Sequence, residues 1–437
     1  MLVNILNKYN KENFSRFHMP GNKSVLDFDI NLSYDVTELD CTDDLYCSNG
    51  IIKNSENLIS DIYGSGCSVF STGGNTLCIQ TMLYLAMPNG GTLIIGKNAH
   101  KSVINTMGIL NIKPVWINYN KNNIICEEIK NAIKKYPEAK AVFITSPDYF
   151  GSMADIKKIK LICKNLIILV DNAHGSHLIF FDNHPINLGA DLCADSAHKT
   201  LPVLTGGAFL HIGKKFSEIN KIKYQDIKSA MQVFGSTSPS FLILVSLEKC
   251  AFWLKNNGKT EFLKLKKIVQ EIKNKYSEIL FKSEIQDPVR LTFDTSNIGL
   301  NNKKFIYYLE KFKIKPEFGI DTRTVLIPSP LNNLQDFEKL NLALENIINK
   351  KNNINFKISK KNNINFNFNF NSKISIHDAM FSRNKNICIK DSENKISAQV
   401  IAKCPPGIPI IIPGEIINKQ KIDILKKLKI NYIKVVI

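Results

Sequence analysis

The sequence predicts an α/β fold, in which a mainly parallel seven-stranded sheet is flanked by helices and a smaller α+β domain follows at the C-terminal end. Two observations predict it. Between residues 66 and 212, short apolar runs alternate with longer segments of helical pattern. The runs are rich in Val, Ile, Leu and Phe and show no polar alternation, which is typical of strands buried on both faces of a parallel sheet.

Each run and each intervening segment has its expected element. The expected strands are residues 66–71, 91–96, 113–118, 140–146, 165–171, 190–196 and 207–212. The expected helices are residues 76–87, 101–110, 126–135 and 155–164. Alternation of this kind places helices on the faces of one sheet. A long amphipathic pattern then covers residues 240–285, and the order of elements is less regular beyond it.

The length of 437 residues exceeds that of one compact domain. We expect an N-terminal arm at 1–50, a large domain at 51–285 and a small C-terminal domain at 286–437. The hexapeptide KNNINF occurs twice between 351 and 371. This segment is either an Asn-rich linker or an edge strand with Phe at every second position, and we assign it no function.

The formal net charge of +18 comes almost entirely from lysine. Of the 57 Lys and Arg residues, four are arginines, at 16, 290, 323 and 383. Arginine is the preferred residue for bidentate recognition of phosphates and bases. We therefore attribute the charge to a general enrichment in lysine, of the kind that codon bias in an AT-rich genome produces. We expect no nucleic-acid partner. The competing hypothesis is a non-enzymatic protein that binds polyanions.

The chain has no uncharged apolar run long enough to span a membrane, so we expect no membrane partner. Its first residues lack the apolar region of a secretory signal. The ten cysteines contain no CxxC pair and mostly lie in apolar stretches. Free thiols of this kind predict a cytoplasmic protein without a structural zinc site.

The sharpest local signal is Asp195-Ser196-Ala197-His198-Lys199-Thr200, between two expected strands. We expect Lys199 at a strand end within an apolar sheet. Burial lowers the pKa of a lysine and makes its amine nucleophilic, as covalent carbonyl chemistry requires. The alternative is an ordinary lysine at the rim of the sheet.

A second signal, Asp171-Asn172-Ala173-His174-Gly175-Ser176-His177, ends the expected strand 165–171. Open α/β sheets bind ligands at the carboxyl ends of their strands. Asp171 could pair with a protonated ring nitrogen, or bind a metal together with His174 and His177. The metal alternative is weak, because no further ligand has matching spacing, and we expect no metal site.

A third signal, Ser71-Thr72-Gly73-Gly74-Asn75-Thr76, joins a strand to a helix. Glycines allow close approach to the backbone, and a helix N-terminus offers free N–H groups to an anion such as phosphate. The alternative is an ordinary helix cap. Together, a phosphate cradle, an acid for a ring nitrogen and a reactive lysine are what pyridoxal 5'-phosphate needs.

Several motifs resemble the Orn/Lys/Arg decarboxylase family in its short form. They are FHMPGNK (17–23), residues 35–64, KNAHKSVIN (97–105), ITSPDYFGSMADI (144–156), DNAHGSHL (171–178), DSAHKTLPVLTGGAFLH (195–211), GSTSPSFLILVSLE (235–248) and CPPGIPIIIPGE (404–415). The resemblance implies the aspartate-aminotransferase-type fold (fold type I), pyridoxal phosphate as cofactor, and a cytoplasmic homodimer or higher homo-oligomer.

The resemblance also implies roles for single residues. Lys199 matches the lysine that binds the cofactor, Asp171 the carboxylate beside its ring nitrogen, and His100 the histidine stacked on its ring. Lys199 or His198 would return a proton to the substrate. The other cofactor-binding positions are Gly74, Asn75 (Ser in the family), Thr76, Ala173, His174, Ser196, Thr237 and Ser238. Thr237 and Ser238 would reach the site on a loop, from this chain or from a partner subunit.

The implied reaction is decarboxylation of a basic amino acid, with arginine favoured and lysine or ornithine as alternatives, to an amine that feeds polyamine synthesis. A cationic substrate needs acidic groups in its pocket. The candidates are the acidic cluster Asp35, Glu38, Asp43 and Asp44, whose other reading is caps of loops and turns.

Four departures from the family pattern bear on substrate and activity, at Asn22, Tyr46, Cys47 and the segment IHDAMF that contains His377. Another reaction on the same cofactor, an aminotransferase or aldolase, is the alternative. Aminotransferases of this fold clamp the substrate carboxylate with an arginine, and Arg323 is the only one near the expected position. The scarcity of arginine therefore favours decarboxylation.

Overall fold

The computed structural model describes residues 2–24, 31–39, 41–120, 123–353, 369–402 and 407–437. The segment 354–368 of the Asn-rich repeat and residues 404–406 of the CPPGIP motif lie outside the described residues. Among the helices that are described, none has both the length and the apolar character needed to cross a membrane.

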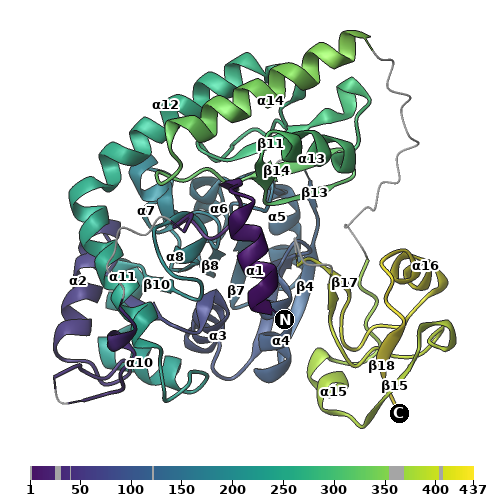
Figure 1. Ribbon diagram of the computed structural model, residues 1–437. Helices are drawn as coiled ribbons and strands as arrows, with labels where there is room; N and C mark the ends of the chain where they lie inside the picture. The colour runs from purple at the N-terminus through teal and green to yellow at the C-terminus, as the bar shows by residue number, and fades with distance from the viewer. Residues whose placement is uncertain (1, 25–30, 40, 121–122, 354–368, 403–406) are drawn as a thin grey trace.

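A seven-stranded sheet forms the centre of the molecule (Figure 1). Its strands run in the order β2–β10–β9–β8–β7–β3–β4. All neighbours are parallel except β10, which is antiparallel to both β2 and β9. The strands are β2 (Cys67–Ser71), β3 (Gly91–Gly96), β4 (Ile112–Ile117), β7 (Ala141–Thr145), β8 (Ile167–Asp171), β9 (Leu192–Asp195) and β10 (Ala208–Ile212). The predicted mainly parallel sheet is confirmed.

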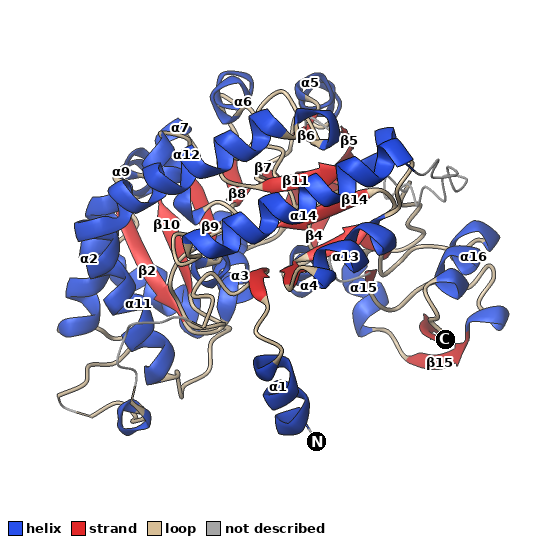
Figure 2. Ribbon diagram, turned by 45° about the horizontal axis from the view of Figure 1, so that its top comes forward, coloured by secondary structure: helices blue, strands red, loops and turns tan. Residues whose placement is uncertain are grey.

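The strands are apolar on both sides because each side faces its own layer of helices (Figure 2). In β3, Leu93 and Ile95 belong to one hydrophobic core and Ile94 to the other. The first core is packed by α2 (Ile51–Tyr63), α3 (Gly74–Ala86), α4 (Lys101–Ile109) and α11 (Phe241–Trp253), and the second by α5 (Cys126–Lys135), α6 (Ile156–Ile162) and α7 (Pro185–Leu188). Burial on two faces explains why the runs lack polar alternation.

The amphipathic segment after residue 240 is one long helical run. It consists of α11, a π-helical turn at Leu254–Gly258 and α12 (Lys259–Lys275). The following part contains the sheet β11–β14–β13 and two helices. These elements are β11 (Leu291–Asp294), α13 (Asn302–Lys311), β12 (Ile314–Pro316), β13 (Phe318–Ile320), β14 (Arg323–Leu326) and α14 (Leu334–Asn353).

The C-terminal residues 369–437 have a hydrophobic core of their own. They contain α15 (Ile376–Phe381), β15 (Asn384–Cys388), β16 (Ile401–Ala402), β17 (Pro409–Ile411), α16 (Lys419–Lys427) and β18 (Tyr432–Val436). By contrast, the first core includes both Ile279 and Leu291, and so continues across residue 285. The division into 1–50, 51–285 and 286–437 stays a proposal.

The remaining elements are short. They are α1 (Leu2–Lys11), β1 (Ser15–Phe17), β5 (Tyr119–Asn120), β6 (Asn123–Ile124), α8 (Ala197–Thr200), α9 (Lys214–Asn220) and α10 (Tyr224–Gln232). β1 pairs in parallel with β12, so the N-terminal arm is tied to the region after residue 286.

Candidate active site

A cavity of about 330 Å³ lies at the carboxyl ends of β7, β8 and β9. Its lining contains ten of the residues expected at a cofactor site: Gly74, Asn75, Thr76, His100, Asp171, Ala173, His174, Ser196, His198 and Lys199. They come from four separate stretches of the chain, which the parallel strands bring to one edge. A larger surface cleft of about 500 Å³, beside Arg323, contains none of the ten.

Lys199 lies on α8, a four-residue helix, and not at a strand end as expected. β9 ends at Asp195, and the chain turns into α8 immediately afterwards. This correction moves the lysine from the sheet to the edge of the cavity, where its side chain is half-buried. Its Nζ lies 3.2 Å from Nε2 of His174.

Asp171 is the last residue of β8 and is buried, with 3% of its surface exposed. Its Oδ1 accepts hydrogen bonds from Nδ2 of Asn75 at 2.9 Å and from the backbone N–H of Ala173 at 3.2 Å. Burial raises the pKa of Asp171 to about 6, against the opposing effects of the Lys199 charge and these hydrogen bonds. A cation beside this carboxylate would restore its charged form.

The glycine-rich turn leads into α3, whose first turn borders the cavity. Gly74 has φ of +69°, a left-handed conformation that favours glycine. The N-cap residue, Gly73, supplies no side-chain hydrogen bond to the first turn. The N–H of Gly74 donates to the carbonyl of Gly206 at 2.8 Å, and the N–H groups that follow it in this turn can serve an anion. The side chain of Asn75 points to Asp171, which is a different contact from the phosphate expected for it.

Two histidines of the cavity are held neutral. Burial, with the Lys199 charge as a smaller cause, lowers the pKa of His100 to about 4. Burial likewise lowers the pKa of His198 to about 4. Nδ1 of His100 accepts a hydrogen bond from the N–H of Ser102 at 3.2 Å, which leaves the proton on Nε2. Nδ1 of His198 donates to the carbonyl of Gly207 at 3.0 Å, so its Nε2 is the basic atom.

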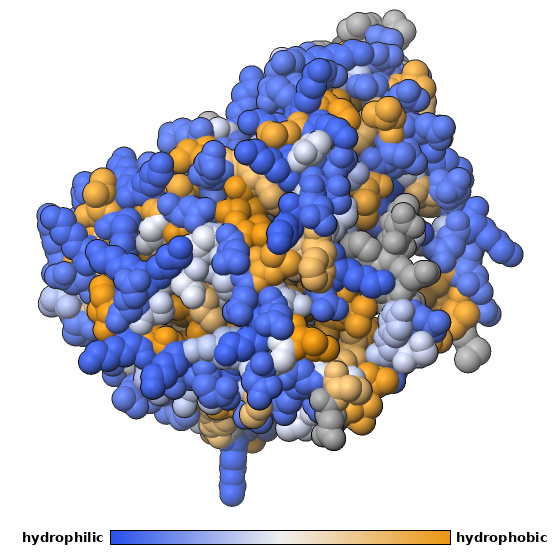
Figure 3. Space-filling model, turned by 90° about the vertical axis from the view of Figure 1, so that its left-hand side faces the viewer, coloured by the Kyte–Doolittle hydropathy of each residue, from blue (hydrophilic) through white to orange (hydrophobic). Residues whose placement is uncertain are grey.

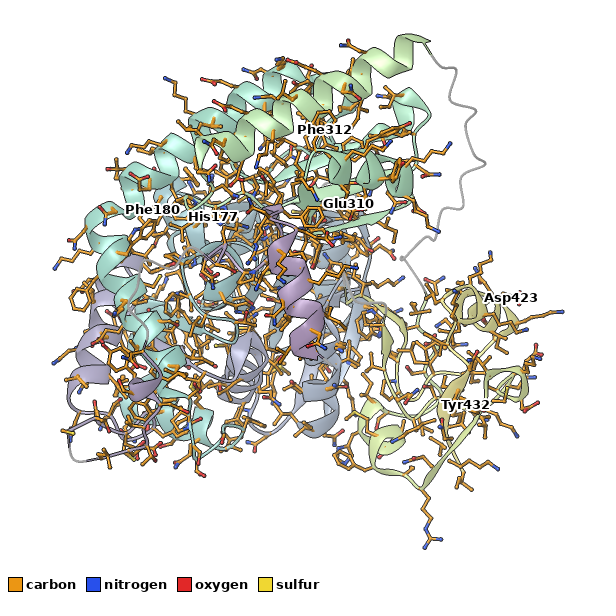
Figure 4. The ribbon with its side chains drawn as sticks, in the orientation of Figure 1. His177, Phe180, Glu310, Phe312, Asp423 and Tyr432 are labelled. Carbon is orange, nitrogen blue, oxygen red and sulfur yellow. The ribbon has the colours of Figure 1, made fainter. Side chains whose placement is uncertain are left out.

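The two histidines of the DNAHGSH motif point in different directions. His174 contacts Lys199 and Nη2 of Arg290, whereas His177 lies 3.0 Å from Oδ1 of Asp287 and stacks on Phe262. Figure 4 shows His177 and Phe180 close together beside α12. The structure therefore does not bring His177 to Asp171, as the metal alternative required.

A buried cluster behind the cavity combines His184, Asp195 and His211, with ligand atoms within 4.8 Å of one another. Nε2 of His184 is 3.0 Å from Oδ2 of Asp195, and Asn172 donates to Oδ1 at 2.7 Å. Nε2 of His211 lies 3.5 Å from the same Oδ2. Hydrogen bonds from His184 and Asn172 hold the carboxylate of Asp195 in this cluster.

Several buried polar atoms around the cavity have no partner among the described residues. They are Oδ1 of Asn75, Nδ2 and Oδ1 of Asn98, and Oγ1 of Thr145. Buried polar atoms are rarely left unpaired, so a group of them around one cavity indicates a polar ligand. With an amine, a carboxylate and a helix N-terminus beside them, the residues fit pyridoxal phosphate.

The family model described as "Orn/Lys/Arg decarboxylase, major domain" matches residues 2–316, and the one for the C-terminal domain of the same family matches residues 363–434. The chain belongs to the Orn/Lys/Arg decarboxylase family.

Curated relatives cover nearly the whole chain. An arginine decarboxylase of Bacillus subtilis is 28% identical, over 94% of this chain and 90% of the relative. An arginine decarboxylase of Halalkalibacterium halodurans is 26% identical, over 95% and 91%. The lysine decarboxylase LdcF of Francisella novicida, a solved structure, has a TM-score of 0.75 at 17% identity and covers 90% of this chain and 73% of its own. The predicted fold type I of pyridoxal phosphate enzymes is confirmed.

Some residues that the resemblance marks lie outside the cavity of this chain. Thr237 and Ser238 are exposed on the loop before α11. Asp35 is exposed, and Glu38, Asp43 and Asp44 are partly exposed in the segment before α2. None of the six lines the cavity.

Asp43 and Asp44 have local roles in that segment. Oδ2 of Asp43 accepts the N–H groups of Gly50 and Ile52 at 3.0 and 3.1 Å, at the start of α2. Oδ1 of Asp44 accepts the N–H of Tyr46 at 2.7 Å. The contacts of these two residues are those of loop caps, the alternative to a substrate-binding role.

Residues of three further segments line this family member's cavity and were missed in the sequence. They are Asn98, Tyr119, Thr145, Asp148, Tyr149 and Phe150. A signal for three of them was present. Asp148, Tyr149 and Phe150 directly follow the expected strand 140–146, just as Asp171 ends the next strand. Ligands bind at the carboxyl ends of strands in open sheets, and this rule applies to the residues after 140–146 as well as to Asp171.

Proposed function

We propose that this chain decarboxylates a basic amino acid, with arginine favoured and lysine or ornithine as alternatives, using pyridoxal phosphate bound at Lys199. One observation carries the proposal: Lys199, Asp171 and the first turn of α3 line a single cavity. The names of the curated relatives favour arginine. The amine product would feed polyamine synthesis, and we propose the cytoplasm as its location.

Each residue has a defined task in this proposal. The cofactor supplies an electron sink for the pair left behind when CO2 departs. Asp171 holds the proton of the pyridine nitrogen, because a charged carboxylate beside that atom favours its protonated form. The α3 N-terminus holds the phosphate. Nζ of Lys199 returns a proton to Cα, or Nε2 of His198 does so after first taking up a proton, while burial of the site excludes water.

The arginines of the described chain support decarboxylation over transamination. Arg323 pairs with Asp294 at 3.5 Å and does not line the cavity. Arg290 is buried, with Nη2 3.3 Å from Nδ1 of His174, and does not line the cavity either. Neither is placed to clamp a substrate carboxylate, and a loosely held carboxylate suits its departure.

We also propose a homodimer, in which the loop of Thr237 and Ser238 contributes to the site of the partner. Exposed apolar side chains support it on the face that carries α2 and α11, where Ile51 is 52% exposed, Val233 61% and Phe252 52%. Figure 3 shows hydrophobic residues interspersed among hydrophilic ones on this side of the molecule.

The test combines an absorbance spectrum with CO2 release. We expect protein purified with pyridoxal phosphate to show the visible band of a lysine-bound cofactor and to release CO2 from arginine, lysine or ornithine. Lys199→Ala should lose the band and on the order of 10⁴-fold in rate, because the covalent anchor and a proton donor disappear together. A wild type without the band would contradict the cofactor proposal. A band without CO2 release would favour an aminotransferase or aldolase.

A further inference from the structure

A second carboxylate shares the cavity with Asp171. Among the described residues that line it, Asp148 and Asp171 are the only acidic ones. Asp148 is buried, with 8% of its surface exposed. It lies three residues beyond Thr145, and Thr145 pairs in register with Asp171 on the neighbouring strand. The two carboxylates therefore lie at the same edge of the sheet.

The turn that follows β7 fixes the orientation of Asp148. Its Oδ1 accepts the N–H groups of Phe150 and Ser152, both at 2.9 Å, and its own N–H donates to the carbonyl of Ser152 at 2.8 Å. Within the described part of the chain, no hydrogen bond is formed by Oδ2. One oxygen thus holds the turn, and the other is available to a ligand.

Asp148 also has no ion pair among the described residues. Arg290 and Arg323 lie near enough to act on its charge, but their ion pairs are with Asp287 and Asp294. Burial is the largest influence on Asp148 and raises its pKa to about 6. An asparagine would accept the same two backbone hydrogen bonds without the cost of burying a charge. The turn alone does not explain why a carboxylate stands here.

The surroundings of Asp148 suit a cation. Tyr119, Tyr149 and Phe150 line the same cavity, and aromatic faces attract cationic groups. The ring of Tyr149 packs against that of His174 with centroids 4.5 Å apart, and His174 contacts Lys199. The side of the cavity formed by Asp148 and these aromatic rings is therefore separated from the amine of Lys199 by the side chain of His174.

We propose that Asp148 binds the distal cationic group of the substrate, the guanidinium or ammonium at the far end of a basic amino acid. The inference rests on the proposed function and identifies its specificity-determining residue. It replaces the acidic cluster before α2 as the source of the negative charge. A charged hydrogen bond in a desolvated site, next to aromatic rings, would distinguish a basic side chain from a neutral one of equal length.

The test compares two amines that differ only at the far end. Cadaverine carries a distal ammonium, and pentylamine has the same five carbons without it; agmatine supplies the guanidinium. Binding to the cofactor-loaded protein is measured by calorimetry for the wild type and for Asp148→Asn, which keeps the acceptor for both backbone N–H groups. Asp155→Asn is the matched control, since Asp155 caps α6 through the N–H of Lys158 at 2.9 Å and lies outside the cavity.

We expect the wild type and Asp155→Asn to prefer cadaverine or agmatine over pentylamine. In Asp148→Asn that preference should fall by about 10- to 100-fold, the size of a charged hydrogen bond, while pentylamine affinity and the cofactor band stay unchanged. In the wild type the preference should weaken as the pH falls through about 6, because the carboxylate becomes protonated, and the variant should lack this dependence.

Three outcomes would overturn the inference. They are an undiminished preference in Asp148→Asn, equal loss of affinity for all amines together with loss of the cofactor band, and a wild type that does not distinguish the amines. Each is separable from failure of the proposed function, which shows as missing CO2 release from the wild type.

Discussion

Two groups of buried charges in this molecule differ in how completely they are paired. Glu56 of α2 and Lys228 of α10 have no exposed surface, and Nζ lies 2.6 Å from Oε1. The backbone N–H of Phe70 and the hydroxyl of Tyr224 donate to the same carboxylate. In the cavity, by contrast, Asp148 has no ion pair within the described chain, and four polar atoms of Asn75, Asn98 and Thr145 have no described partner.

The difference shows how to tell a structural charge from a functional one. Removing one member of a buried, hydrogen-bonded pair leaves an uncompensated charge, whereas the intact pair offers little to a ligand. Buried polar groups that border a cavity and stay unpaired cost stability in the free protein, and a ligand that pairs with them recovers that cost. Variants of the first group should therefore affect unfolding, and variants of the second should affect binding and reaction.

The largest expected effect on stability comes from breaking the paired group. Glu56→Gln should lower the free energy of unfolding by about 3–5 kcal/mol, because Lys228 would remain buried without a counter-charge. Activity per folded molecule should stay near that of the wild type, since neither residue lines the cavity. Urea unfolding and CO2 release measure the two quantities.

The double variant Glu56→Leu with Lys228→Met is the control for that change. Removing both charges should restore most of the lost stability, because no buried charge is then left alone. If both the single and the double variant leave unfolding unchanged but abolish CO2 release, the pair belongs to the reaction and the comparison fails.

The next effect has the opposite sign and comes from the cavity. The pKa of Asp171 rises from 3.8 to about 6 on folding, so the folded state binds a proton that the unfolded state releases. Stability of the cofactor-free protein is thus lost as the pH rises between about 4 and 6. Asp171→Asn should remove this loss and increase the free energy of unfolding by as much as about 3 kcal/mol at pH 7 to 8.

Denaturant unfolding of cofactor-free protein from pH 4 to 8 measures that difference. The difference in the free energy of unfolding between Asp171→Asn and the wild type should be small near pH 4 and constant above pH 6. With pyridoxal phosphate bound the order should reverse, because Asp171 then has a cationic partner. A variant less stable than the cofactor-free wild type at pH 7 would show that Asp171 is already compensated by this chain.

The sequence predicts the sheet well, for a physical reason. Strands buried on two faces must be apolar throughout, so the seven runs were visible without any knowledge of their neighbours. Asp171 and Gly74 were found because strand ends and glycine-rich turns mark ligand sites in open sheets, whereas Lys199 was found although it lies on α8 and not at the strand end expected for it. Their relative arrangement depends on strand order, which local patterns do not encode.

Other features depend on contacts between distant residues. Asp148 resembled an ordinary turn residue, and only the cavity distinguishes it from Asp43, which also accepts backbone N–H groups. The continuity of the first core across residue 285 likewise arises from packing between Ile279 and residues beyond 289, about which periodicity within one segment says nothing.

The smallest expected effect tests the acidic cluster directly. Asp43 has φ of +66° and accepts the N–H groups of Gly50 and Ile52 at the start of α2, where the N-cap residue Gly50 has no side chain to do so. Asp43→Ala should cost about 1–2 kcal/mol in unfolding, because both N–H groups lose their acceptor. Asp43→Asn should cost less, since asparagine keeps an acceptor and tolerates the left-handed conformation. KM for arginine should be unchanged in both, measured beside urea unfolding. A KM raised tenfold with unchanged stability would return Asp43 to the substrate pocket and remove the distinction between a carboxylate that caps a helix and one, Asp148, that faces a cavity.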